Sequence, residues 1–332
     1  MRPLKIAQIG MGPLGVRMCR MSEGRAGEEV VSAADMNPDI YGKSLGQYCD
    51  IDDTGVRISP GISEAIDMGV PDVAILTTVS EMEAVTPQIL KILSHGIPVV
   101  STCEELSFAW HTYPALAESI DKAAKIAGVS VVGTGVNPGF LMDTLPTMLT
   151  AVCSKVEFVE VRRFQDAKYR RLPFQQKIGA GLNLEEFESR YQSGMLRHVG
   201  LTESLHFISN QLGWKHEVVK EELVPVIASG LIRTNDITVY PGQAAGVRQV
   251  GEAYVDGEIK IRLIFQAAVG EPESYDEILI KGEPNFTSRI DGGINGDIAT
   301  CAITLNTARV ISMAKPGLRT MGDIPLVSGL GV

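Results

Sequence analysis

A chain of 332 residues and 35.8 kDa is long for one compact core and corresponds to about two domains of ~150 residues each. Its 45% hydrophobic and 21% charged residues are typical of a globular protein and exclude a disordered or fibrous chain. The formal net charge of -10 would repel a phosphate backbone. We therefore expect small-molecule partners and no nucleic-acid surface.

Cysteine usage and the N-terminal residues indicate a cytoplasmic protein. The 5 cysteines are odd in number and show no CxxC spacing, which favours reduced thiols over disulfides and indicates no metal site. Residues 1–15 contain one short apolar run followed by glycines, unlike a signal peptide. No run of ~18 apolar residues is present, so we expect no membrane span.

Short β-branched runs alternate with helical stretches in the first part of the chain, which predicts a parallel sheet covered by helices. We therefore expect an α/β fold with a doubly wound, Rossmann-type sheet. In chain order, the predicted elements are a strand at 5–9, a helix at 13–23, strands at 30–34 and 73–77, a helix at 81–95, a strand at 98–102, a helix at 113–127 and a strand at 129–132.

Beyond Gly139 strands follow strands, which predicts an α+β domain with a mostly antiparallel sheet and a tight hairpin at Asp256-Gly257. We assign residues 1–140, completed by 296–332, to a dinucleotide-binding domain and 141–295 to a substrate-binding and dimerisation domain. Because open antiparallel sheets commonly pair across a two-fold axis, we expect a homodimer. The predicted elements here are a strand at 156–163, a helical stretch at 184–213, strands at 237–240, 247–255, 259–268 and 277–280, and a helix at 297–313 that returns to the first domain.

The segment GMGPLG directly follows the first strand and opens a helix. Gly10 allows a tight turn, Gly12 lets the backbone approach a pyrophosphate, and Gly15 permits close packing of helix on strand. Pro13 and Leu14 complete the first helical turn, whose N-terminus favours a phosphate. The segment predicts a nicotinamide dinucleotide site; the alternative is a glycine turn without a ligand.

Asp35 supports the dinucleotide interpretation because it ends the second predicted strand, about 20 positions past Gly15, where a carboxylate binds ribose hydroxyls. Its charge favours NAD over NADP, whose extra phosphate would be repelled. Asn37, Lys43 and Arg57 lie near in sequence and leave NADP as an alternative, although such residues are more often solvated surface.

Ligands of open α/β sheets bind beyond the carboxyl ends of the strands, so Thr77 and Thr78 are predicted cofactor contacts. Glu104 and Glu105 follow the next strand at the same edge. A half-buried carboxylate beside a nicotinamide suits proton transfer near neutral pH. The competing interpretation, of equal weight from position alone, is that both acids favour the positive end of a helix.

The glycine-rich segment 133–140 links the two predicted domains. Asn137 is predicted to orient the carboxamide of the cofactor or the substrate, although a turn residue before proline is the commoner role. Phe140 is predicted to line the substrate pocket.

Positive charge gathers at residues 162–171 of an otherwise acidic chain, and a guanidinium there would bind a substrate carboxylate. Strand alternation places Arg162 and Arg163 on opposite faces, so at most one of them reaches a pocket. For each arginine a surface ion pair is the commoner role. For His198, a structural role is at least as common as a contact with the substrate. The candidate substrate contacts are Glu105, Phe140, Arg162, Tyr169, Arg170 and His198.

The chain resembles the 2,4-diaminopentanoate dehydrogenases and related native amine dehydrogenases, within the dihydrodipicolinate-reductase-like superfamily. The resemblance covers nearly the whole chain. It rests on IGMGPLG at 9–15, STCEEL at 101–106, GTGVNPGF at 133–140 and GINGDIATC at 293–301.

This resemblance implies NAD- or NADP-dependent oxidative deamination of an amine or diamino acid, and reductive amination of a ketone in reverse. It implies that the glutamate of STCEEL is the catalytic acid/base, which places the role on Glu104, with Glu105 as the second choice. An amino-acid substrate would use the arginines, His198 and Asn137, whereas a simple ketone would need an apolar pocket. The apolar candidates are Phe140, Met142, Phe164 and Tyr169.

Two other functions are compatible with a nucleotide-binding fold. The first is an imine reductase of dihydrodipicolinate type, which neither His95 nor His111 supports because they lie in no paired-histidine segment. The second is a nucleotide-sensing protein without turnover, which the acidic residues at the strand ends argue against.

Overall fold

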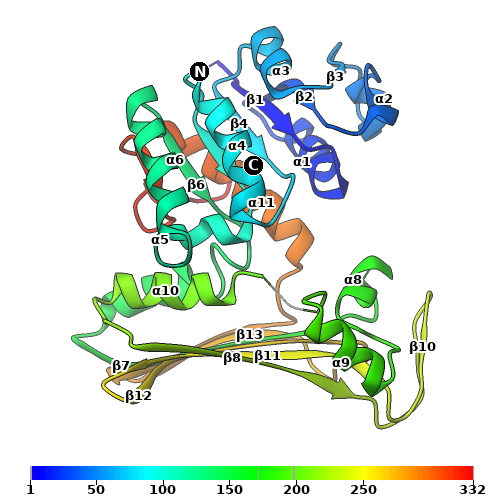
Figure 1. Cartoon of the computed structure of the whole chain (residues 1–332), viewed down its shortest axis with the longest axis vertical. Coiled ribbons are helices and arrows are strands. Elements are labelled where there is room, and N and C mark those ends of the chain that lie inside the picture. Colours follow the sequence, from blue (N-terminus) through cyan, green and yellow to red (C-terminus); the bar gives the residue numbers. More distant parts are fainter. Residues whose placement is uncertain (1, 171, 197–198, 332) are drawn as a thin grey trace. The chain divides into compact units, whose positions relative to one another are not determined.

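The computed structural model describes residues 2–170, 172–196 and 199–331. They form two compact units, Met1–Phe140 with Asn295–Val332, and Leu141–Ile294 (Figure 1). Among the described residues all the cysteines are free thiols, four of them buried. None of the helices that the structure describes has the length and hydropathy that crossing a membrane requires.

The first unit is built on a seven-stranded sheet in the order β15-β6-β5-β4-β1-β2-β3, with parallel pairing throughout the described residues. The predicted doubly wound fold is confirmed. The chain starts in the middle of this sheet at β1. It adds β2 and β3 on one side of β1 and the later strands, from β4 onward, on the other side, so the strand order reverses between β1 and β4. The strands are β1 (Leu4–Ile9), β2 (Glu28–Ala34), β3 (Ile58–Ser59), β4 (Val73–Leu76), β5 (Val99–Ser101), β6 (Ser130–Gly133) and β15 (Gly317–Arg319).

Helices cover both faces of this sheet, because its strands are apolar on both sides. Leu76 of β4 packs with α4 and α6 on one face. Its neighbour Ile75 packs with α1 and with Leu305 of α11 on the other, so the C-terminal helix belongs to this unit. The helices are α1 (Pro13–Glu23), α2 (Leu45–Cys49), α3 (Ile62–Gly69), α4 (Met82–Leu93), α5 (Ala109–Thr112), α6 (Pro114–Ala127) and α11 (Gly296–Val310).

The second unit contains a six-stranded sheet in the order β14-β13-β7-β12-β11-β8. Only the β7 and β12 pair is parallel among the described strands, so the prediction of a mostly antiparallel sheet is confirmed. Asp256 and Gly257 have φ values of 53° and 76° and form the predicted hairpin turn. The strands are β7 (Lys155–Asp166), β8 (Val218–Ile227), β11 (Ala244–Val255), β12 (Glu258–Ala268), β13 (Tyr275–Glu283) and β14 (Phe286–Asp291), with a separate pair of β9 (Ile232–Arg233) and β10 (Thr238–Val239).

One face of this sheet carries α10 (Figure 1). Gly251 of β11 allows the close approach, since a Cβ there would lie 3.0 Å from Leu201 and from Leu205. The stretch predicted to be largely helical at 184–213 contains two helices, α9 and α10. The helices of the unit are α7 (Thr144–Leu149), α8 (Leu172–Lys177), α9 (Leu184–Gln192) and α10 (Leu201–Gln211).

A buried ion pair lies on the helix-covered face. Arg163 of β7 is 2% exposed and binds Asp276 of β13 at 2.8 Å, and both side chains bond the backbone of Ile294. Burial lowers the pKa of Arg163 and raises the pKa of Asp276. Desolvation therefore offsets the attraction between the two charges. Removing one partner would leave the other buried without an ion-pair partner at this position.

We expect Arg163→Met to lower the free energy of unfolding by about 3 kcal/mol or more, because Asp276 then remains charged and buried without its partner. Arg162→Met is the matched control. Arg162 is half-exposed on the opposite face, where it pairs with Glu160 and Glu277, and its loss should cost about 1 kcal/mol or less. Urea unfolding of both variants measures the difference, and equal losses would contradict the prediction.

Candidate active site

The carboxyl ends of the strands in the first unit form one continuous edge. The residue after each strand donates its backbone N–H to the end of the neighbouring strand, at distances of 2.8 to 3.1 Å. This edge includes the point between β1 and β4 where the chain reverses, which is the usual ligand position in such sheets. The donors, in spatial order, are Asp35, Gly10, Thr77, Thr102 and Thr134.

Two glycines of the loop after β1 are required by packing. Gly10 has a φ of 93°, and a Cβ there would lie 2.8 Å from the carbonyl oxygen of Thr77. At Gly15 a Cβ would lie 2.0 Å from the carbonyl oxygen of Gly10, so only glycine lets α1 start so near the strand. These are the roles that the sequence predicts for the first and third glycines of the motif.

Gly12 differs because nothing lies within 4 Å of the position of its Cβ. It is the N-cap of α1, with Pro13 at the first helical position, so an anion can approach this helix end without meeting a side chain from the cap. The side chain of Leu14 instead packs into the core beside α11. The open side at Gly12 fits the pyrophosphate of a dinucleotide.

Asp35 is fixed against the glycine loop. Its carboxylate accepts the backbone N–H of Met11 at 2.6 Å and that of Asn37 at 2.8 Å. The side chain is half-buried at the end of β2, where the sequence predicts a ribose contact. Asn37 caps the turn that follows, and Arg57 donates to the carbonyl of Gly42, so both have structural partners.

A buried polar network contacts the glycine loop after β1 on the side of the sheet. Sequence analysis did not identify this network. Gln8 of β1 is 1% exposed and donates to the carbonyl of Gly10 and to the hydroxyl of Thr77. Thr77 in turn donates to the carbonyl of Gly10 at 2.9 Å. Thr78 bonds Gln88 of α4. A buried glutamine inside a strand is the signal by which sequence reasoning would have found this support.

The two glutamates after β5 have different environments. Glu105 is buried, and its carboxylate accepts the N–H of Met82, the first residue of α4, at 2.7 Å. It therefore stabilises a helix start. Glu104 is half-buried at the start of a short 3₁₀-helix, Glu104–Phe108. Burial raises the pKa of the adjacent Cys103 well above its ordinary value, so this thiol stays protonated and is no rival as a base.

The segment after β6 folds back on itself. A Cβ at Gly139 would lie 2.4 Å from the backbone N of Gly135, and Val136 donates to Thr300 of α11. Asn137 is buried in this turn. Phe140, at its end, is half-buried.

Thr134, which sequence analysis did not single out, also belongs to this edge. It is 3% exposed, and its hydroxyl has no hydrogen-bond partner among the residues that the structure describes. A buried hydroxyl without a protein partner is a natural contact for a polar ligand group. It therefore supports the assignment of this edge to a ligand.

The described residues of the positively charged segment, 162–170, have different surroundings from one another. Arg162 is held by Glu160 and Glu277, so its expected contact with a substrate carboxylate would compete with two protein carboxylates. Tyr169 is 83% exposed. Arg170 lies 4.1 Å from the centre of the Phe174 ring and contacts Gln165. His198 and Arg171 lie outside the described residues.

The comparisons with known proteins agree with this architecture. The family model of the 2,4-diaminopentanoate dehydrogenase C-terminal domain matches residues 140–331. A curated 2,4-diaminopentanoate dehydrogenase of Acetoanaerobium sticklandii is 32% identical over 335 residues, covering 98% of this chain and 94% of the relative.

Two solved structures show the same fold. An amine dehydrogenase of Mycobacterium smegmatis aligns with a TM-score of 0.85 at 21% identity, covering 98% of this chain and 97% of that one. A dihydrodipicolinate reductase of Paenisporosarcina sp. TG-14 aligns with a TM-score of 0.53 at 14% identity, covering 96% and 97%. The chain thus belongs to the 2,4-diaminopentanoate dehydrogenase family, which confirms the predicted family and the predicted enzyme class, an amine dehydrogenase dependent on a nicotinamide dinucleotide.

Proposed function

We propose that this enzyme oxidatively deaminates a small diamino acid such as 2,4-diaminopentanoate and catalyses the reverse amination of the ketone. The observation that carries the proposal is the shared sheet edge, which joins the open glycine loop at Gly12 to the half-buried carboxylate of Glu104. The name of the Acetoanaerobium relative supports the substrate class.

Glu104 manages the protons of the reaction. A nicotinamide dinucleotide held by the glycine loop and Asp35 would supply the hydride acceptor for the amine-bearing carbon. Glu104 takes a proton from the substrate ammonium and returns one as water adds to the imine and ammonia leaves. Glu105 does not share this role, because the N–H of Met82 already occupies its carboxylate inside the fold.

Arg170 is the proposed partner of the substrate carboxylate in the second unit. Its guanidinium lies over the ring of Phe174, which orients it, and a guanidinium can bind a carboxylate through two parallel N–H groups. Phe140 and Asn137 remain proposed contacts of the substrate and of the carboxamide.

Initial rates with a panel of diamino acids, amino acids and simple amines test the proposal. We expect turnover of 2,4-diaminopentanoate, and we expect cofactor oxidation with the corresponding ketone only when ammonia is present. Oxidation of the reduced cofactor by the ketone at a rate that does not depend on ammonia would contradict amine chemistry. Nucleotide binding without turnover of any amine would indicate a sensor instead.

NAD is the proposed cofactor, because the carboxylate of Asp35 would repel a 2′-phosphate. We expect Asp35→Ser to raise the ratio of kcat/KM with NADP to kcat/KM with NAD by about tenfold, which corresponds to ~1.4 kcal/mol of removed repulsion. Arg57→Gln is the control, since Arg57 bonds the backbone of Gly42. A ratio that falls in Arg57→Gln and stays constant in Asp35→Ser would instead assign a phosphate contact to Arg57.

We also propose a cytoplasmic homodimer formed through the sheet face that α10 does not cover. A row of alternating charges crosses this face, and neighbouring charges pair at distances of 2.5 to 3.4 Å. Such a row is complementary to a second copy of itself across a two-fold axis. Light scattering after size exclusion measures the mass. The row consists of Arg289, Glu277, Arg162, Glu160, Arg262 and Glu252.

A further inference from the structure

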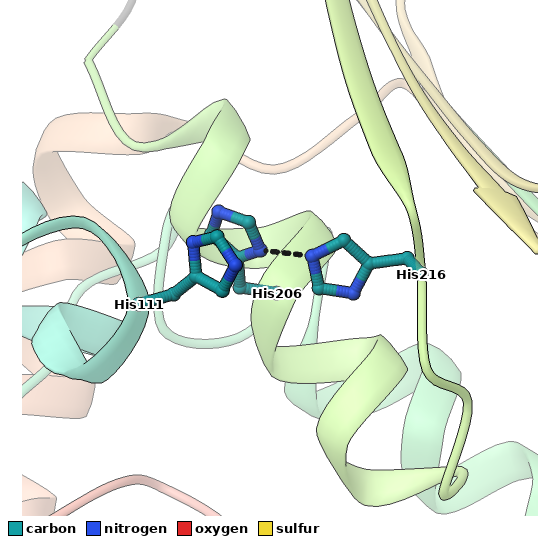
Figure 2. A group of neighbouring side chains, drawn as sticks. All are labelled: His111, His206 and His216. Atoms are coloured by element: carbon teal, nitrogen blue, oxygen red, sulfur yellow. Dashed lines mark hydrogen bonds between the residues drawn. The ribbon is translucent and has the colours of Figure 1, made fainter.

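Two histidines of the second unit face each other. Nδ1 of His206 and Nε2 of His216 lie 2.8 Å apart (Figure 2). The ring centres are 4.7 Å apart and the ring planes differ by 37°. Neither side chain has a role in the proposed reaction.

The backbone holds both histidines in place. His206 lies on the buried face of α10 and is 4% exposed. His216 is half-buried in the segment that joins α10 to β8. Trp214 donates its N–H to Ser209 of α10 at 2.8 Å, and Glu217 donates to Tyr254 of β11 at 2.9 Å. His216 therefore lies between two anchored residues, and its partial exposure leaves a path for a small ion.

The separation of the two nitrogens is close to that of two ligands on one metal ion. Bonds of about 2.0–2.1 Å at angles of 90° to 109° place two imidazole nitrogens about 2.9–3.4 Å apart. The observed nitrogen–nitrogen distance of 2.8 Å lies just below the lower end of this range. Rotation of the half-buried His216 ring would move its Nε2 out of direct contact and leave space for an ion in front of Nδ1 of His206.

We propose that His206 and His216 form a binding site for a divalent transition-metal ion, with Zn²⁺ and Cu²⁺ as the ions best suited to neutral imidazole. On binding, the proton between the two nitrogens moves to the other nitrogen of its own ring, and each freed lone pair forms one metal bond. Water completes the coordination. The ion would tie the start of β8 to α10.

Titration of the full chain, stripped of metal by a chelator, with Zn²⁺ and separately with Cu²⁺ tests the site at pH 7.5. We expect one equivalent per chain, with Cu²⁺ bound more tightly than Zn²⁺, and at least tenfold weaker binding in His216→Gln and in His206→Gln. His95→Gln is the matched control, because His95 bonds Ser63 and Asp67 in the first unit, and it should bind as the wild type does.

Affinity should also fall as pH drops below ~6, since imidazole must be neutral to bind a metal. His216→Gln keeps the test valid if His206→Gln does not fold, because His216 is the less buried partner. The proposal is overturned by an absence of binding at millimolar metal, or by a folded His216→Gln variant that binds as tightly as the wild type.

Discussion

Replacing Glu104 by glutamine is expected to reduce kcat by a factor of about 10² to 10⁴, the usual contribution of a positioned acid or base. Glutamine keeps the size of the side chain and its hydrogen bonds but does not transfer protons. The dissociation constant of NADH should change little, since the glycine loop and Asp35 form a separate part of the edge. Stopped-flow rates and the fluorescence of bound NADH measure the two quantities.

Glu105→Gln is the matched control because the two side chains are adjacent and chemically identical. Its amide oxygen accepts the N–H of Met82 in a weaker bond than the charged carboxylate does, so we expect a lower Tm, whereas kcat should stay within about tenfold of the wild type. A Glu104→Gln enzyme with normal turnover would remove the proposed role from Glu104. If Glu105→Gln lost kcat while its Tm stayed constant, the acid/base would be Glu105.

The central strands could be predicted because each is an apolar run long enough to show a pattern. β1 and β4 are examples, and the glycine loop fixes the helix that follows β1. β3 and β15 have two and three residues, too few to show any period. β14 escaped prediction because its residues are partly exposed and polar, and only pairing with β13 makes it a strand.

The site shows the same division between local and long-range information. The roles of Gly10 and Gly15 follow from spacing alone, and alternation placed Arg162 and Arg163 on opposite faces as expected. Sequence did not show which arginine is buried, because Asp276 lies 113 positions away. The assignment of Glu105 to the start of α4 likewise depends on a contact 23 positions distant.

Gly15→Ala is expected to destabilise the first unit by about 3 kcal/mol, because the new methyl group would overlap backbone that has little freedom to move. A Cβ at this position would lie 2.0 Å from the carbonyl oxygen of Gly10, so α1 must move away from β1 to make room for it. The displaced helix should also lose its affinity for NADH. Urea unfolding and NADH fluorescence should therefore both change in this variant.

Gly12→Ala separates ligand binding from folding. Its methyl group meets no atom within 4 Å, so stability should stay within about 0.5 kcal/mol of the wild type. The same methyl group projects into the space assigned to the pyrophosphate, and it should weaken NADH binding by about tenfold or more, or ~1.4 kcal/mol. A stable Gly12→Ala variant with unchanged affinity would mean that the dinucleotide does not cross the N-terminus of α1, whereas an unstable one would mean that this position is closed by packing. The two glycines lie on one helical turn. If Gly12→Ala loses affinity but keeps its stability, and Gly15→Ala loses stability, then the loop contacts the ligand at Gly12 and packs against the strand at Gly15.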